Sequence, residues 1–440
     1  MIRGRLKGQN AMNTLEINKT VKARMKWALA GASRRSSLPI LSNGLIYPAG
    51  EGLGVRSTDL DVTTIAEFSE VFEPRAFALS AAGLGKLVAG LKGGEVRFSP
   101  NCTACAVTSS AGSLSLPMLP ADEFPPVPVA SELVGQFDAA AVIGALRQVE
   151  HAQSTDQTRY ILNGVCLEIG HESAALIAAD GKRLRIASVP RLDPTDSLLL
   201  AIMRGNLANS EAMLGEVETA ERGAASVATC PTVIKARDEV IAARAKVAAA
   251  REELGKVRRI VVPSAAVALL LKMPVEPGAL VRVSVGVNEA EKEKPSFVRF
   301  ECGPCALVSK QVDGTFPNWR QCVPVDCKER VQFDAAELIA VIKAGSAAST
   351  QKETAVRFSF TKHLLTVSSK SEDCGEASAS VAINYPFADF ATALNPDYAA
   401  EAVKSFVGLS PFTLEWTDEL TPVVFRAGDS FEVLMPMRMN

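Results

Sequence analysis

The chain has 440 residues, a formal net charge of −2 and 48% apolar residues, a length and composition that allow several domains with real cores. No apolar run approaches the length of a membrane span, and the first residues lack the apolar segment of a signal peptide. Nine cysteines, an odd number without secretory features, indicate a reduced, cytoplasmic protein. The near-neutral net charge gives no reason to expect nucleic acid, so the distribution of charge matters more than its sum.

The first part of the chain is basic where helices are predicted. Residues 1–11 are polar and basic, and Met12 is a second candidate start. Helices are predicted at 19–31 and 80–91. The stretches Ile17 to Gly50 and Arg75 to Gly94 contain Lys and Arg but no Asp or Glu. A surface that faces a polyanion and an ordinary solvated helix face are both compatible with this pattern.

Short apolar strands surround these two helices. They are predicted at 44–47, 53–58, 62–68, 77–79, 96–98 and 104–108. Strands in series with only two helices indicate antiparallel sheet with helices on one face, an α+β arrangement. The Pro-rich stretch 120–129 is a natural linker.

The middle of the chain continues this pattern. A helix is predicted at 138–151, and Asp180-Gly181 marks a tight turn before a strand at 183–188. Another helix is predicted near 264–273. Between them, two runs of apolar residues at heptad spacing cover about 196–257 and predict an antiparallel helical hairpin. A hairpin that protrudes and one that lies flat on the domain fit the pattern equally well.

An internal repeat gives the domain organisation. The segment Gln136 to Ala140 returns letter for letter at Gln332 to Ala336, and each copy places an Asp where it would cap a helix. A third, blurred copy is Leu15 to Asn18. The repeat predicts three equivalent domains, which are domain 1 (12–130), domain 2 (131–327, containing the insertion) and domain 3 (328–440). Helices of domain 3 are expected near 334–345 and 385–394.

Two Cys-x-x-Cys pairs are the only motifs that suggest metal or redox chemistry. Cys302 and Cys305 stand between strand-like segments, so that Gly303-Pro304 is more simply a hairpin turn, and Cys102 and Cys105 occupy the equivalent place in domain 1. The three histidines are isolated, and there is no nucleotide-binding or hydrolase motif. We therefore expect no catalytic residue, no metal and no cofactor.

Several segments resemble the bacterial β sliding clamp, the processivity subunit of the replicative DNA polymerase. They are Ser37 to Asn43, Thr58 to Asp61, Arg159 to Gly164, Ala179 to Leu184, Asp313 to Pro317 and Val433 to Arg438. They occur in the family's order over the whole chain, outside the insertion and the first dozen residues. The resemblance implies the DNA-clamp fold and a head-to-tail homodimer that closes a ring of six similar domains, with helices lining the hole.

The resemblance also implies functional residues. Duplex DNA would pass through the ring without sequence-specific contacts, and the implied DNA-binding residues are Arg35, Lys22, Arg24, Lys86, Arg147 and Tyr160. The implied dimer interface contains Leu114, Leu116, Ala348 and Ser349, the last two smaller than the family pattern. The implied pocket for peptide motifs is formed by Leu162, Gly181, Arg183, Leu184, Pro317, Leu420, Pro422, Val433, Met435, Pro436, Met437 and Arg438.

The implied partners are the replicative polymerase, the clamp loader, repair polymerases, ligase and mismatch-repair proteins, at the nucleoid and without a membrane. One alternative is a specialised clamp paralogue whose helical hairpin binds a dedicated partner. A second, from another class, is a zinc or thiol-redox protein that uses the Cys-x-x-Cys pairs.

Overall fold

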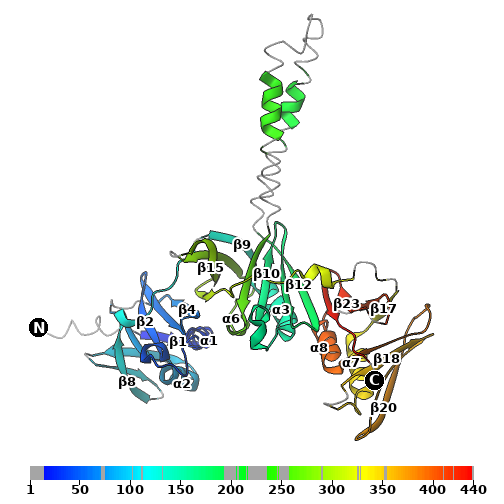
Figure 1. The fold of residues 1–440 in the computed structure, drawn as a ribbon. Coiled ribbons are helices and arrows are strands. Elements are labelled where there is room, and N and C mark those ends of the chain that lie inside the picture. Colours follow the sequence, from blue (N-terminus) through cyan, green and yellow to red (C-terminus); the bar gives the residue numbers. More distant parts are fainter. Residues whose placement is uncertain are drawn as a thin grey trace, which may run out of the picture.

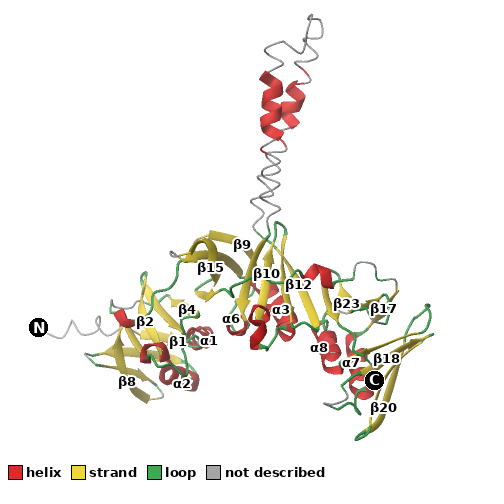
Figure 2. Ribbon diagram, in the orientation of Figure 1, coloured by secondary structure: helices red, strands yellow, loops and turns green. Residues whose placement is uncertain are grey.

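The fold was analysed in a computed structural model. It describes residues 14–70, 75–101, 103–110, 112–130, 132–192, 205, 208–214, 216, 235–244, 246, 257–288, 291–324, 327, 329–350, 354–409, 411–419 and 421–438. The three predicted domains follow one another along an arc, with the helices along its concave side and the sheets outside (Figures 1 and 2). None of the helices assigned in those ranges has the length and apolarity that a bilayer crossing needs.

Domain 1 has two helices among antiparallel strands. Its elements are β1 (Thr14–Ile17), α1 (Lys19–Ala28), the 3₁₀ turn η1 (Pro39–Ser42), β2 (Asn43–Ala49), β3 (Gly52–Thr58), β4 (Val62–Phe68), β5 (Phe77–Ser80), α2 (Ala81–Gly90), β6 (Gly94–Pro100), β7 (Ala104–Ser109), β8 (Gly112–Pro120) and η2 (Ala121–Glu123).

Domain 2 repeats this arrangement. Its elements are β9 (Glu132–Asp138), α3 (Ala139–Val149), η3 (Glu150–Ala152), η4 (Gln157–Leu162), β10 (Gly164–Ile169), β11 (Ser173–Ala179), β12 (Arg183–Pro190), β13 (Arg258–Pro263), α6 (Ser264–Leu270), β14 (Leu280–Asn288), β15 (Glu291–Cys302), β16 (Cys305–Lys310) and η7 (Trp319–Cys322).

Domain 3 repeats it again. Its elements are β17 (Glu329–Phe333), α7 (Ala335–Gly345), β18 (Val356–Thr361), β19 (Leu364–Ser371), β20 (Gly375–Ala382), β21 (Phe390–Leu394), α8 (Pro396–Ser405), β22 (Phe412–Trp416), β23 (Val423–Ala427) and β24 (Ser430–Leu434).

The sheets cross the domain boundaries. A 12-stranded sheet has the order β1-β6-β7-β8-β5-β2-β3-β4-β16-β15-β14-β9, so it joins domain 1 to domain 2 through the pair β4 and β16. An 8-stranded sheet has the order β13-β10-β11-β12-β24-β23-β22-β17 and joins domain 2 to domain 3 through β12 and β24. A 4-stranded sheet, β20-β19-β18-β21, completes domain 3.

The repeated aspartates cap helices, as the sequence predicts. Asp138 Oδ1 accepts a hydrogen bond from Ala141 N at the start of α3 (2.7 Å). Asp334 Oδ1 accepts from the N–H groups of Ala336 (2.9 Å) and Glu337 at the start of α7. Asn18 does the same for α1 in the blurred copy. Each side chain satisfies a helix N–H that would otherwise lack a partner, which stabilises a helix by about 1 kcal/mol.

One predicted helix is wrong. Residues 385–394 include the strand β21, which pairs with β18, and the helix of this region is α8 at Pro396–Ser405. The start signal is Asn395, whose side chain accepts from Asp397 N and Tyr398 N, followed by Pro396 at the first helical position. The apolar spacing before it belongs to a strand and the loop that precedes it.

The insertion is described only in part. Residues 208–214 and 235–244 are helical, and Figure 1 draws these two pieces side by side and apart from the sheets. Arg244 Nη2 lies 2.8 Å from Glu211 Oε1, which joins the two pieces, and Val240 is buried between exposed neighbours. The rest of the predicted hairpin lies outside the described residues.

Candidate functional site

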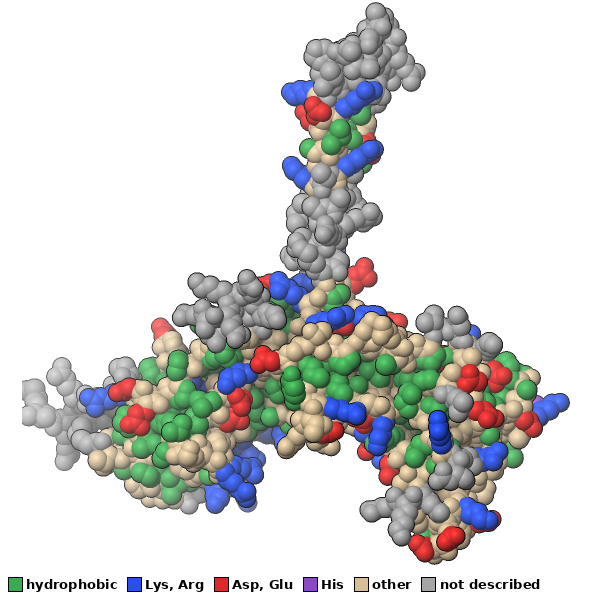
Figure 3. Space-filling view, in the orientation of Figure 1, with side chains coloured by type: hydrophobic (Ala, Val, Ile, Leu, Met, Phe, Trp, Pro, Cys, Tyr) green, Lys and Arg blue, Asp and Glu red, His purple; other side chains and the backbone are tan. Residues whose placement is uncertain are grey.

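Basic side chains collect on the helical side of domain 1. In Figure 3, Lys and Arg side chains gather at the lower edge of this domain, beside α1 and α2. Arg35, Lys86 and Arg147, three of the predicted DNA-binding residues, are exposed. A fourth, Tyr160 on η4, is 58% exposed. These four side chains are accessible to a ligand.

Two other predicted DNA-binding residues are engaged within the chain. Lys22 Nζ donates hydrogen bonds to the carbonyl oxygens of Ala89 (2.7 Å) and Leu91 (2.6 Å), at the C-terminal end of α2 where helix carbonyls carry partial negative charge. Arg24 forms an ion pair with Glu276 and so ties α1 to domain 2. Both positive charges are partly neutralised by contacts that stabilise domain 1 and its junction with domain 2.

Three predicted pocket residues lie together where domains 2 and 3 meet. Strand β12 pairs with β24 in the register Arg183 to Leu434 and Leu184 to Val433. Leu162, Leu184 and Val433 belong to one buried cluster that also contains Phe316. The cluster combines side chains of η4, β12, β24 and the segment after β16, so that only the folded junction assembles it.

The rim of this junction is open. Gly181 has a φ of 88°, a conformation that favours glycine, and Arg159 Nη1 lies beside it, 2.4 Å from where a Cβ atom would stand. Met435 is 48% exposed, and its N–H donates to Lys182 O (2.9 Å). Pro317 is exposed, and Pro422 and Pro436 are half-buried. Leu420 lies outside the described residues. We refer below to Leu162, Leu184, Val433, Gly181 and Met435 as the 2–3 groove, a name for this set of residues and not for an observed cavity.

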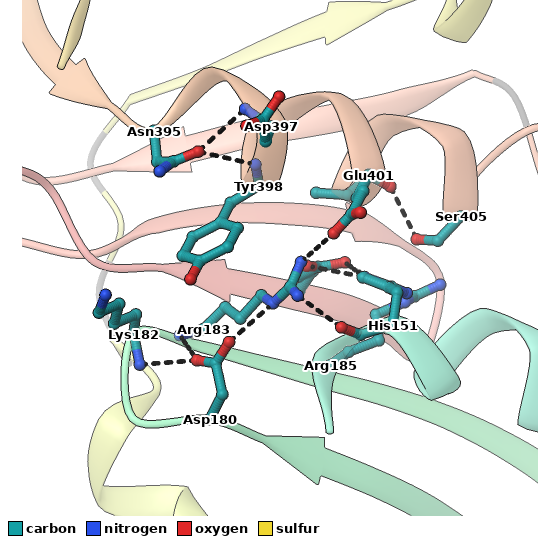
Figure 4. Close-up of polar contacts among 12 residues, drawn as sticks. His151, Asp180, Lys182, Arg183, Arg185, Asn395, Asp397, Tyr398, Glu401 and Ser405 are labelled. Atoms are coloured by element: carbon teal, nitrogen blue, oxygen red, sulfur yellow. Dashed lines mark hydrogen bonds and ion pairs between the residues drawn. The ribbon is translucent and has the colours of Figure 1, made fainter. Parts of the chain in front are cut away.

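The Arg183 side chain is buried between domains 2 and 3 and is not part of the exposed rim. Figure 4 shows its guanidinium between domain 2 and helix α8, and its side chain is only 8% exposed. It bonds to Asp180 Oδ2 (3.0 Å), to Glu401 Oε2 and to the carbonyl of His151, and it lies over the ring of Tyr398, 4.3 Å from the centroid. The bond to Glu401 and the contact with Tyr398 hold domain 3 against domain 2, and the bonds to Asp180 and His151 fix the guanidinium within domain 2.

A second arginine of β12 is fully buried beside it. Arg185 Nε lies 3.8 Å from Glu432 Oε2, and neither side chain has any exposed surface. His151 Nε2 is 3.1 Å from both oxygens of Glu432, and the Arg185 guanidinium lies 4.1 Å from the centre of the Phe406 ring. Burial lowers the pKa of Arg185 to about 10, and the Glu432 carboxylate opposes that shift.

The segment that carries Pro317 is anchored by a buried carboxylate. Glu168 on β10 is 4% exposed and accepts hydrogen bonds from Trp319 Nε1 (3.1 Å), Arg320 Nη2 (2.8 Å) and Arg259 Nε (2.8 Å). Burial alone would raise the pKa of Glu168, but these donors outweigh it and hold the pKa below its ordinary value. The anchor was not foreseen from the sequence, because Glu168 and Arg320 are far apart in the chain.

The last predicted pocket residues lie against domain 3. Met437 N donates to Ala393 O on β21 (2.7 Å), which directs the tail along the edge of the 4-stranded sheet. Met437 and the exposed Arg438 line a cavity of about 810 Å³ together with side chains of β18, β19 and β20 such as Arg357 and Lys370. The structure therefore groups these two residues with domain 3 and not with Leu162.

The predicted interface residues belong to β8 and to the turn after α7, and within the described chain β8 and β20 each have a strand edge without a partner. Leu116 is buried in the core of domain 1 and Leu114 is half-buried on the same strand, β8. Ala348 is 3% exposed, and Ser349 donates to Ser346 O within its own turn. In the strand pairing of the described chain, β20 pairs only with β19, and residues 112–117 of β8 pair only with β7.

The Cys-x-x-Cys pair of domain 2 closes a hairpin. Cys302 and Cys305 are opposite one another at the ends of β15 and β16, with Gly303 at a φ of 54° in the turn. Both thiols are buried, and burial raises the pKa of Cys305 to about 12. A buried thiol with a raised pKa is a poor nucleophile and metal ligand. Cys102 lies outside the described residues, and within them no three His, Cys, Asp or Glu side chains are arranged to hold a metal ion.

Two family models match the ends of the chain. The model described as "DNA polymerase III beta subunit, N-terminal domain" matches residues 14–128, and "DNA polymerase III beta subunit, C-terminal domain" matches residues 320–438. Together these ranges cover more than half of the chain. They correspond to predicted domains 1 and 3.

Whole-length relatives agree with these models. The chain is 25% identical to the beta sliding clamp of Caulobacter vibrioides over 385 residues, which is 85% of each protein. It is 22% identical to that of Chlamydia muridarum over 408 residues, 92% of each. The sliding clamp structures of Pseudomonas aeruginosa (TM-score 0.74) and Bacillus subtilis (0.75) are each 18% identical and cover 97% of this chain and 99% of theirs. The α+β fold is thus that of the sliding clamps.

The buried pair at the junction gives a stability prediction. In Glu432→Gln the charge of Arg185 stays buried without its counterion, and we expect a loss of about 3 kcal/mol in the free energy of unfolding of the junction. Urea denaturation followed by tryptophan fluorescence measures it. The matched control is Glu376→Gln, because Glu376 pairs with Lys370 on the surface and its loss should leave the midpoint unchanged. Equal midpoints for the two variants would contradict the assignment.

Proposed function

Because the chain belongs to the DNA polymerase III beta subunit family, we propose that two copies close head to tail into a ring that encircles duplex DNA. The protein is a non-catalytic processivity factor. The proposed ring tethers a replicative polymerase, and the same grooves serve the clamp loader, repair polymerases, ligase and mismatch-repair proteins in turn. We place this activity in the cytoplasm, at the nucleoid.

The observation that carries the proposal is the arc of three similar domains with helices on its concave side (Figure 1). Two such arcs joined end to end enclose a hole lined by helices. The domain ranges 12–130, 131–327 and 328–440 are the proposed repeating units, since each contains the same two helices and antiparallel strands.

Unpaired strand edges support closure of the ring. Among the described strands, residues 112–117 of β8 in domain 1 and the outer edge of β20 in domain 3 have no partner, so a head-to-tail contact would bring one copy's β8 beside its partner's β20. Unpaired edges are a liability that proteins cover or pair. We propose that pairing of these strands continues the sheet across the interface, with Leu114, Leu116, Ala348 and Ser349 packed beneath it.

The proposed DNA contacts are electrostatic. Arg35, Lys86, Arg147 and Tyr160 are exposed, and exposed basic side chains attract phosphates without reading bases. Lys22 and Arg24 contribute to the positive field of domain 1, although their side chains are already bonded within the chain.

The 2–3 groove is the proposed peptide site. Its floor is apolar, Met435 is exposed and adaptable, and the exposed Arg159 and Lys182 give the rim a positive charge. An acidic peptide with apolar side chains in an extended segment fits this combination. Pro317, Pro422 and Leu420 are proposed to border it, with Pro436, Met437 and Arg438 at its domain 3 end.

The insertion favours a second, additional role. Met213 is 60% exposed and Ile241 63% exposed on the two helical pieces, so both apolar side chains are accessible to a partner. We propose that residues 196–257 form a helical hairpin that binds a dedicated partner and makes this chain a specialised clamp.

The DNA proposal predicts a change in salt dependence. The variant Lys86→Ala should bind a linear duplex of about 40 base pairs more weakly whatever the DNA sequence. The slope of log K, the association constant, against log salt should decrease in magnitude by about 0.9. Fluorescence anisotropy at roughly 25 to 200 mM salt, a range in which phosphate contacts weaken strongly, measures the affinity and the slope. Lys362→Ala in the turn between β18 and β19 is the control and should leave the slope unchanged. Identical slopes for the two variants would remove Lys86 from the DNA-facing surface.

The groove proposal predicts a loss of peptide affinity. Met435→Ala removes an exposed apolar side chain, and a labelled hexapeptide of sequence Glu-Leu-Glu-Leu-Phe-Glu, the acidic probe, should bind at least about tenfold more weakly. Anisotropy with the full-length chain measures this. The control Val407→Ala removes another exposed apolar side chain, on the turn after α8, and should bind the probe normally. Unchanged binding to Met435→Ala would place the peptide site elsewhere.

The proposed helical hairpin of residues 196–257, called the arm below, can be tested separately from the ring. Replacement of residues 196–257 by a short Gly-Ser linker should leave the number of chains in the assembly and the affinity for DNA unchanged, since the sheets of domain 2 pair without the arm. Light scattering and the same DNA titration measure these two properties. If the replacement dissociates the assembly, the arm belongs to the ring and not to a dedicated partner.

A further inference from the structure

The junction of domains 1 and 2 has the same backbone frame as the 2–3 groove. Strand β16 pairs with β4 as β24 pairs with β12, antiparallel and across a domain boundary. Beyond the end of each pairing, one more bond links the domains: Lys310 N donates to Asp61 O (2.8 Å), and Met435 N donates to Lys182 O (2.9 Å). Asp61 therefore occupies the place of Lys182, and Lys310 the place of Met435.

The turns beside these bonds are also equivalent. Asp59 Oδ1 accepts from Asp61 N (3.0 Å) and Val62 N (2.7 Å), just as Asp180 Oδ1 accepts from Lys182 N (2.9 Å) and Arg183 N (3.0 Å). The residue after each aspartate has a positive φ, 82° for Leu60 and 88° for Gly181. The position that is a glycine in the 2–3 groove is thus a leucine here.

Leu60 is costly to the fold. A residue with a Cβ atom in the left-handed conformation is destabilised by about 1 kcal/mol. The residue is 47% exposed, so burial stabilises its side chain only in part. A strained and exposed apolar side chain at the tip of a turn is more easily explained by a ligand than by stability.

A second exposed leucine belongs to the same place in the repeat. Leu38 precedes Ile40 and Leu41 of η1 as Arg159 precedes Ile161 and Leu162 of η4, and Leu38 is 52% exposed. In domain 2, Arg159 lies against Gly181. The equivalent pair in domain 1 is Leu38 and Leu60.

Domain 1 also has an equivalent of the buried apolar floor. Ile40 and Leu41 form a cluster with Phe124, which is 5% exposed, as Leu162 forms one with Phe316, which is 4% exposed. The buried floor and the rim of the 2–3 groove therefore both have counterparts in domain 1.

The charge at the turn is reversed between the two junctions. Lys182 is replaced by Asp61, whose side chain is 72% exposed, and Asp59 on the other side of Leu60 is exposed as well. Lys310 Nζ pairs with Asp61 Oδ1 at 2.9 Å, but an ion pair between exposed groups stabilises little and can be displaced by a ligand. Arg34 and Arg35 precede Leu38, yet both charges next to Leu60 are acidic.

We propose that Leu38, Leu60, Asp59 and Asp61 form a second docking site, at the junction of domains 1 and 2, for a short extended peptide whose apolar side chains are flanked by Lys or Arg. The 2–3 groove would take peptides of the opposite charge. One chain would then sort two classes of partner by the charge that flanks the same kind of apolar anchor. This inference rests on the proposed function only for its comparison with the 2–3 groove.

The test uses a basic probe, a labelled hexapeptide of sequence Lys-Leu-Lys-Leu-Phe-Lys, and the full-length chain. Leu60→Gly removes the apolar side chain and relieves the strain of the positive φ, so the variant should fold at least as well as the parent. We expect it to bind the basic probe at least about tenfold more weakly and the acidic probe normally. Asp61→Lys should weaken the basic probe and strengthen the acidic one at this junction.

The control is Met435→Ala, which alters the 2–3 groove and should leave the affinity for the basic probe unchanged. Absence of binding by the basic probe, an unchanged affinity in Leu60→Gly, or a loss in Met435→Ala as large as in Leu60→Gly would each overturn the proposal. Failure of the ring would leave these binding results intact, because the probes need only one chain. If the chain forms rings but does not bind the basic probe, the second docking site is refuted and the proposed ring is not.

Discussion

Antiparallel pairing of strands across domain boundaries is the constraint on which the rest of this structure depends. Strand β4 would be the edge of the sheet in domain 1 and β12 that of domain 2, and each is instead paired with a strand of the next domain, β16 and β24. Backbone N–H and C=O groups at these edges are thereby satisfied, and the pairing sets the angle at which each domain follows the last. The arc of helices follows from this geometry (Figure 2).

The same pairing underlies both proposed docking sites. Where a strand of the next domain is added, its end and the neighbouring turn meet beside an apolar cluster, which brings together residues distant in sequence at each boundary. At the boundary of domains 2 and 3 the frame is fixed further by Arg183 and by the buried Arg185 and Glu432, which use polar bonds where apolar packing would allow sliding. The exposed side chains at these sites are therefore free to differ, as they do between Gly181 and Leu60.

The sequence was most informative where local signals and repetition agree. Asp138 and Asp334 could be recognised as helix caps because the same five residues occur twice, and the three-domain plan of the α+β fold followed from them. The helix predicted at 385–394 is wrong because apolar spacing in a short segment fits a strand as well as a helix, whereas the cap Asn395 followed by Pro396 starts the helix further along the chain.

Other features of the site could not be obtained from one sequence. The donors to Glu168 come from Arg259, Trp319 and Arg320, and the engagement of Arg24 depends on Glu276, all of them contacts between residues far apart in the chain. The burial of Arg183 was also hidden, since an arginine in a turn next to a groove looks like a binding residue until Glu401 and Tyr398 are placed around it. The roles of Glu168, Arg24 and Arg183 depend on partners that only the folded chain brings next to them.

The central claim is that two arcs close into one ring, and the mass of the full-length chain in solution tests it most directly. Sedimentation equilibrium should be measured over about a hundredfold range of micromolar concentrations, since a dimer of useful stability persists across such a range. We predict a single species with twice the 46.6 kDa of one chain. A mass of 46.6 kDa throughout that range would contradict closure by two copies.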